Sequence, residues 1–128
     1  MLLAGIDIGG TKMEVSLFRV GDGLPNKQYN LYFNDKNWDA EKILSQRTPT
    51  DRHLGYEKVS ANLIDLIKET VAASGNTLED LNSIGIGLPG IVDPLTGQMK
   101  NGNTAISFFL SATPIIVLVT CIFKNRKI

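Results

Sequence analysis

The sequence predicts an α/β domain, because two strand patterns are followed by one long helix pattern and then by a further strand pattern. Strands that bury one face and a helix that buries one stripe are the parts from which a layered domain is assembled. With 128 residues the chain has the length of a single domain and can bury a core of its own.

The first two strand patterns are joined by three small or polar residues. Residues 2–8, LLAGIDI, are short, largely apolar and followed by glycine, which is typical of a buried strand. Residues 12–19, KMEVSLFR, alternate apolar and polar side chains, as in a strand with one covered face. Because only GGT separates them, we expect an antiparallel hairpin. A third strand is expected at residues 27–33, and a polar loop or short strand extends to Arg47.

The middle of the chain has the pattern of an amphipathic helix. The Thr50-Asp51 pair offers an N-terminal cap, and apolar residues then recur at helical spacing, which predicts a helix over residues 51–74. Gly75 follows as a stop signal. Residues 83–88, SIGIGL, predict a second buried strand behind this helix.

The charge balance and the cysteine content exclude several classes of protein. Thirteen basic residues match 13 acidic ones, and no basic stripe is interleaved with aromatic residues, so we expect no nucleic-acid partner. The single cysteine, Cys121, excludes an internal disulfide framework and fits a reducing compartment. Because the first residues show no secretory signal pattern, we expect a cytoplasmic protein.

The segment GIDIGGTK places a carboxylate and two glycines at the end of the first strand. A Walker loop and a dinucleotide fingerprint both need a helix after their glycines, whereas a strand pattern follows here. The residues instead suggest a hairpin in which Gly9, Gly10, Thr11 and Lys12 bind phosphate, while Asp7 holds Mg²⁺ through water. An ordinary tight hairpin, in which the aspartate caps its own turn, remains an alternative.

The sequence also resembles the ROK family of bacterial sugar kinases and repressors, within the sugar-kinase, hexokinase and actin superfamily. GIDIGGTKMEVSLF resembles the first phosphate motif of that superfamily, and IGIGLPGIVDPLTGQMKNGNT resembles a ROK segment that reaches the sugar. The resemblance covers residues 3–104. It implies a ribonuclease-H-like (actin-like ATPase) N-terminal domain with a mixed sheet and flanking helices. It also implies Mg²⁺-dependent transfer of the ATP γ-phosphate to a sugar hydroxyl.

The same resemblance assigns roles to individual residues. It matches Asp7 to the magnesium-associated carboxylate and the glycine turn with Thr11 and Lys12 to the phosphate site. The residues matched to the sugar pocket are Gly87, Pro89, Gly90, Asn101, Asn103 and Thr104. The substrate would be fructose, mannose, glucose or N-acetylglucosamine, and full-length family members are often homodimeric. Taken alone, the second segment is better explained as a set of ordinary turns, and it is the two motifs together that favour a sugar site.

The end of the chain departs from the family pattern. The family's general base is an aspartate in an NDAN-like segment, and nothing after residue 104 matches it, so no catalytic residue is assigned. We therefore expect residues 1–104 to be a truncated N-terminal lobe, inactive alone, and residues 105–128 a divergent apolar tail. A fragment of a sugar-sensing repressor is one alternative. Another is a membrane-tethered nucleotide-binding module anchored through residues 105–123, which carry no charge.

Overall fold

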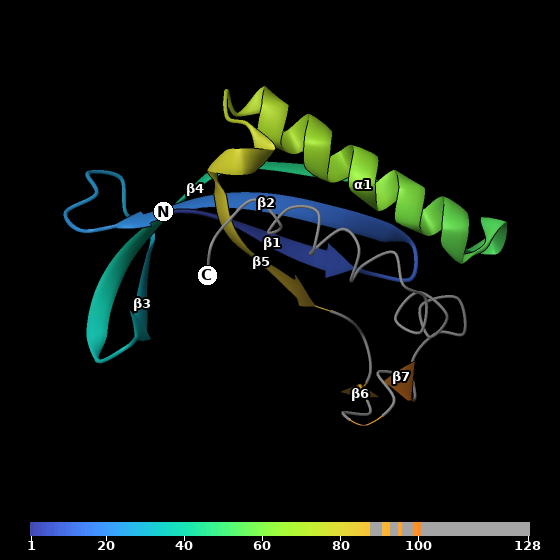
Figure 1. Ribbon diagram of the computed structural model, residues 1–128, viewed down its shortest axis with the longest axis horizontal. Helices are drawn as coiled ribbons and strands as arrows, with labels where there is room; N and C mark the ends of the chain where they lie inside the picture. Colours follow the sequence, from blue (N-terminus) through green and yellow to red (C-terminus); the bar gives the residue numbers. More distant parts are fainter. Residues whose placement is uncertain (88–90, 93–94, 96–98, 101–128) are drawn as a thin grey trace.

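A computed structural model describes residues 1–87, 91–92, 95 and 99–100, and its main feature is a five-stranded mixed sheet (Figure 1). The strand order is β3-β4-β2-β1-β5. The β1 strand runs parallel to β5 and antiparallel to β2, and β4 is antiparallel to both β2 and β3. The bounds are β1 Leu2–Ile8, β2 Lys12–Gly21, β3 Tyr29–Phe33, β4 Lys36–Pro49 and β5 Leu81–Gly87.

One long helix covers one face of this sheet. The α1 helix spans Tyr56–Ala73, and short 3₁₀ helices lie at Arg52–Leu54 (η1) and Leu78–Asp80 (η2). Two-residue strands, β6 Ile91–Val92 and β7 Met99–Lys100, form a separate antiparallel pair. The turn between β1 and β2 lies at the same end of the molecule as the start of α1 (Figure 1).

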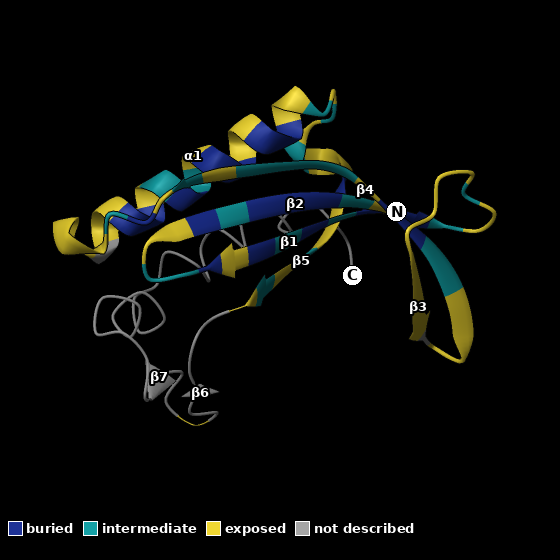
Figure 2. Ribbon diagram, turned by 180° about the vertical axis from the view of Figure 1, so that it is seen from behind, coloured by how far each residue is buried: buried dark blue, intermediate teal, exposed yellow. Residues whose placement is uncertain are grey.

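The hydrophobic core fills the layer between α1 and the sheet. Buried side chains alternate along β1 and β2, as the two-residue period of a strand requires. Along α1 they recur every three or four residues, as the 3.6-residue period of a helix requires. Figure 2 shows the inner stripe of α1 buried and its outer side exposed. The fully or almost fully buried members are Ala4, Ile6, Ile8, Met13, Val15, Leu17, Val59, Leu63, Leu66, Ile67, Val71 and Leu81.

Most strand predictions are confirmed, and of the two alternatives for the segment up to Arg47 the polar loop is wrong, while the strand is present but longer than expected. The first strand has the predicted bounds, and the strand expected at residues 83–88 is β5, Leu81–Gly87. The segment before Arg47 is not a loop, because β4 runs for 14 residues, from Lys36 to Pro49. Residues 36–40 of β4 pair with β3 and residues 39–49 pair with β2, so backbone pairing makes this segment a strand although most of its side chains are polar.

The predicted start of the helix is also wrong. The α1 helix begins at Tyr56 with Gly55 as its N-cap, and neither Thr50 nor Asp51 caps it. Asp51 has a left-handed conformation with φ 53°, and Gly55 follows with φ 89°. Asp51 lies before η1, and Gly55 separates η1 from α1, so the helix begins at Tyr56 and not at residue 51. At its other end Gly75, with φ 80°, terminates the helix as expected.

Several predictions fall outside the described residues. They concern Pro89, Gly90, the asparagines near residue 102 and the apolar tail at residues 105–128. In the part of the chain that is described, no helix has both the length and the apolar content that crossing a bilayer requires.

Candidate functional site

The turn between β1 and β2 brings two backbone segments unusually close together. The Gly9 N–H donates to the Lys12 carbonyl oxygen at 2.9 Å. A Cβ atom on Gly9 would lie 2.9 Å from that same oxygen, closer than real side chains approach a carbonyl. The hairpin itself therefore requires glycine at position 9, whether or not a ligand binds there.

Gly10 differs, because the backbone of the hairpin does not require glycine at this position. Its φ is not positive, and a Cβ placed on it would make only an ordinary contact, 3.5 Å from Arg52 Nη1. An alanine would therefore fit the fold. The lack of a side chain at position 10 leaves the tip of the turn open, and folding alone gives no reason for it.

A buried threonine from outside the hairpin ties down the carbonyl groups of the turn. Thr50 is completely buried, its Oγ1 donates to the Gly9 oxygen at 2.8 Å, and its N–H donates to the Thr11 oxygen at 2.9 Å. Within the described residues, the N–H groups of Gly10 and Thr11 donate to no protein acceptor. Two carbonyls of the turn, those of Gly9 and Thr11, are thus occupied, and two of its donors are free, which is an arrangement that suits an anion.

The carboxylate of Asp7 lies one residue before the end of β1, next to this turn. In the sheet Asp7 pairs with Glu14 on β2 and with Gly87 on β5. These residues, together with Gly85, line a hollow of about 570 Å³ on the sheet face opposite α1. Asp7 and Gly87 come from the two separate sequence motifs, and the fold places them side by side at the C-terminal ends of the parallel strands β1 and β5.

Glu14 is held by three side chains on the same sheet. Ser45 Oγ donates to Oε1 at 2.7 Å, Arg47 Nε donates to Oε2 at 2.5 Å, and Ser16 Oγ donates to Oε1 at 3.3 Å. The hydrogen bond from Ser45 and then the one from Arg47 lower the pKa of Glu14 below its ordinary value, although partial desolvation opposes them. Glu14 is therefore an ionised and well-anchored neighbour of Asp7.

The lowered pKa of Glu14 makes a prediction about acid stability. The stabilisation is fully present above the ordinary pKa of about 4.3 and is lost as the pH falls through the lower pKa of the folded protein. We expect Glu14→Gln to lower the urea midpoint of unfolding at pH 7. We also expect the midpoint of this variant to decrease less than that of the unaltered chain between pH 5 and pH 3. An equally steep fall in the variant would contradict this role of Glu14.

Asp7 suits a magnesium ion that keeps most of its water ligands. In the described part of the chain, no group of three or more His, Cys, Asp or Glu side chains could enclose a metal ion. Mg²⁺ needs no such group, because it is commonly held by one or two carboxylates, by water and by substrate phosphates. The Asp7 side chain is exposed, and Asp7 precedes the two free donors of the turn by three and four residues. The donor set therefore fits a magnesium ion that is shared with a phosphate.

The structure describes the residues predicted to bind phosphate and places them close together, and it adds two neighbours, Thr50 and Arg52, that the sequence did not assign to the site. Asp7, Gly9, Gly10, Thr11 and Lys12 lie at or beside one turn, and Gly87 lies next to Asp7. The remaining sugar-pocket residues, Pro89, Gly90, Asn101, Asn103 and Thr104, are outside the described range. Thr50 carried a sequence signal, but it was interpreted as a helix cap. Arg52 carried none.

Comparisons with known proteins point to sugar kinases. Over 103 residues the chain is 28% identical to an N-acetyl-D-glucosamine kinase of Haemophilus influenzae, covering 80% of this chain and 26% of the relative. It is 36% identical over 101 residues to the enzyme of the same name from Pectobacterium atrosepticum, covering 77% and 25%. The chain thus spans about a quarter of the length of these relatives. No family model matches it.

The fold has a counterpart among solved structures. The crystal structure of a ROK hexokinase from Thermus thermophilus superposes with a TM-score of 0.61 at 21% identity, covering 97% of this chain and 33% of that one. The predicted α/β fold with a mixed sheet, of the kind found in ROK kinases, is thereby confirmed.

Proposed function

Because the chain is related to the ROK-family sugar kinases and matches only part of their length, we propose that it forms the phosphate-binding part of an ATP-dependent hexose kinase. In this proposal the turn at Gly9–Thr11 binds the phosphates of ATP, and Lys12 adds a positive charge. A sugar hydroxyl would receive the γ-phosphate in the hollow beside Asp7 and Gly87.

One observation carries the proposal most directly. Thr50 donates to the carbonyl oxygens of Gly9 and Thr11, while the N–H groups of Gly10 and Thr11 have no acceptor in the described part of the chain. Gly10 is partly buried and Thr11 is exposed, and two free donors in succession beside carbonyls that are already occupied form a concave set of N–H groups that favours a bound anion. An ordinary hairpin would need neither the Thr50 bonds nor a second glycine.

The proposed role of Asp7 is to hold Mg²⁺ against the nucleotide through coordinated water. The ion would supply neutralisation of the charge that develops on the phosphoryl group during transfer. Glu14 cannot easily replace Asp7, because Arg47 and two serines already occupy its oxygens. Asp7 is therefore the carboxylate of this pair that we assign to the ion.

N-acetyl-D-glucosamine is the first sugar to test, since two relatives are named as kinases of that sugar. Glucose, mannose and fructose are the other substrates that the proposal includes. Transfer needs a base within hydrogen-bond reach of the sugar hydroxyl, and we assign none among the residues 1–128. We therefore propose that this chain by itself binds nucleotide without phosphorylating a sugar.

Nuclear magnetic resonance of the isotopically labelled full chain tests the proposal. During titration with Mg²⁺ and a non-hydrolysable ATP analogue, the amide signals of Gly10 and Thr11 should shift together and saturate. The analogue without Mg²⁺ should bind more weakly, and Asp7→Asn should abolish that difference. If the amides of the turn do not move at millimolar nucleotide, the proposed function is wrong.

A further inference from the structure

Arg52 lies beside the open glycine of the phosphate-binding turn, although it is 42 positions further along the chain. Its Nη1 atom is 3.5 Å from the point where a Cβ of Gly10 would stand. The backbone brings the start of η1 to the turn, because Thr50 is bonded to the turn and Asp51 follows with φ 53°. Arg52 follows at once as the first residue of η1.

The guanidinium of Arg52 differs from those of the other arginines in the described part of the chain. Arg19 forms an ion pair with Glu41, and Arg47 forms one with Glu14. The Arg52 side chain, in contrast, has neither an ion pair nor a hydrogen bond to any described residue, and Arg52 is exposed. The guanidinium thus lies beside the open glycine of the turn without an acidic partner among the described residues, and its positive charge is available to an anion.

We propose that Arg52 is a further ligand of the nucleotide, and that its guanidinium binds oxygens of the polyphosphate chain. This inference rests on the proposed function and adds to it a residue that lies outside the two sequence motifs. A guanidinium is always charged and offers a planar fork of donors that matches a phosphate group. The amides of Gly10 and Thr11 and the fork of Arg52 would then share one anion.

The same arrangement explains why position 10 has no side chain. A methyl group there would contact Arg52 Nη1 at 3.5 Å and would occupy the space between the guanidinium and the turn. The protein fold tolerates that contact, but an oxyanion bound to both groups needs the space. Gly10 and Arg52 therefore form one binding feature rather than two unrelated ones.

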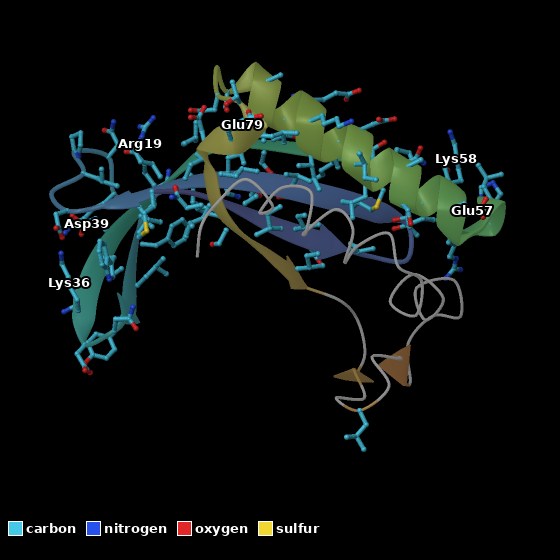
Figure 3. The ribbon with its side chains drawn as sticks, in the orientation of Figure 1. Arg19, Lys36, Asp39, Glu57, Lys58 and Glu79 are labelled. Atoms are coloured by element: carbon cyan, nitrogen blue, oxygen red, sulfur yellow. The ribbon has the colours of Figure 1, made fainter. Side chains whose placement is uncertain are left out.

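Calorimetric titration of the full chain with Mg·ATP, at fixed low ionic strength, tests this inference. Arg52→Gln should raise the dissociation constant about tenfold or more, and Arg52→Lys should retain part of the affinity, because it keeps the charge without the fork. The matched control is Lys36→Gln, which removes the same charge at the opposite end of the molecule (Figure 3). Lys36 bonds to the exposed Asp22 and lies over the Trp38 ring, so its loss should lower stability only slightly and leave nucleotide affinity unchanged.

Each outcome of this titration has a distinct meaning. If Arg52→Gln and Lys36→Gln both bind like the unaltered chain, Arg52 is not a nucleotide ligand, and the proposed function is unaffected. If both variants weaken binding equally, the effect is one of overall charge, and the inference is overturned. If the unaltered chain binds no nucleotide, the proposed function fails and the inference fails with it. Thermal melting of each variant confirms that the fold is intact.

Discussion

Alanine in place of Gly10 is expected to weaken Mg·ATP binding about tenfold or more, while the melting temperature of the free protein stays the same. The fold accepts a Cβ at this position, since its nearest neighbour would be the end of a flexible side chain at 3.5 Å and φ is not positive. A bound phosphate, however, would meet the new methyl group as it approaches the amides of the turn. The loss should appear in calorimetry and in the amide shifts of Thr11.

Gly9→Ala is the matched control, because it adds the same methyl group one residue earlier. There the Cβ would lie 2.9 Å from the Lys12 carbonyl, so the hairpin backbone must shift. We expect a loss of about 1–3 kcal/mol in the free energy of unfolding, the usual cost of forcing an extra group into a packed site. If Gly10→Ala destabilised the protein as much as Gly9→Ala, position 10 would be a structural glycine and the argument for phosphate would fail.

The strands and the helix that carry the core could be predicted because their side chains have a regular period. Residues 2–8 are apolar throughout, and residues 12–19 alternate, so the burial of β1 and β2 follows from the sequence itself. The β4 strand has no such signal. Its side chains are mostly polar and half exposed, and what makes it a strand is pairing with β2 on one side and β3 on the other.

The candidate site divides in the same way into local and long-range parts. The acid and the glycine turn are adjacent in the sequence, so their chemistry could be predicted from GIDIGGTK alone. Thr50 could not be predicted, because its bond to Gly9 spans 41 positions and exists only once β2 and β4 have paired. Threonine is a residue type that commonly caps helices, but the Thr50 hydroxyl bonds to the hairpin instead, and α1 begins at Tyr56.

Thr50→Val is expected to lower both stability and nucleotide affinity. Valine keeps the shape of threonine but cannot donate to the Gly9 carbonyl, which the Thr50 hydroxyl contacts at 2.8 Å in a fully buried position. A buried acceptor left without its donor costs about 1–3 kcal/mol, to be measured by urea unfolding. The Gly9 oxygen would then be free to turn toward a ligand, where it would repel a phosphate, so the dissociation constant for Mg·ATP should rise as well.

Thr70→Val separates these two effects. Thr70 is also fully buried, and its hydroxyl donates to the Leu66 oxygen at 2.6 Å, but it lies in the last turn of α1, away from the hairpin. This variant should lose some stability and keep its nucleotide affinity. If the two variants lowered affinity equally, Thr50 would contribute only to folding. A larger loss of affinity in Thr50→Val, at matched stability, would instead indicate that the buried threonine orients the carbonyl groups of the turn. The N–H groups of the turn would then be left free to bind an anion.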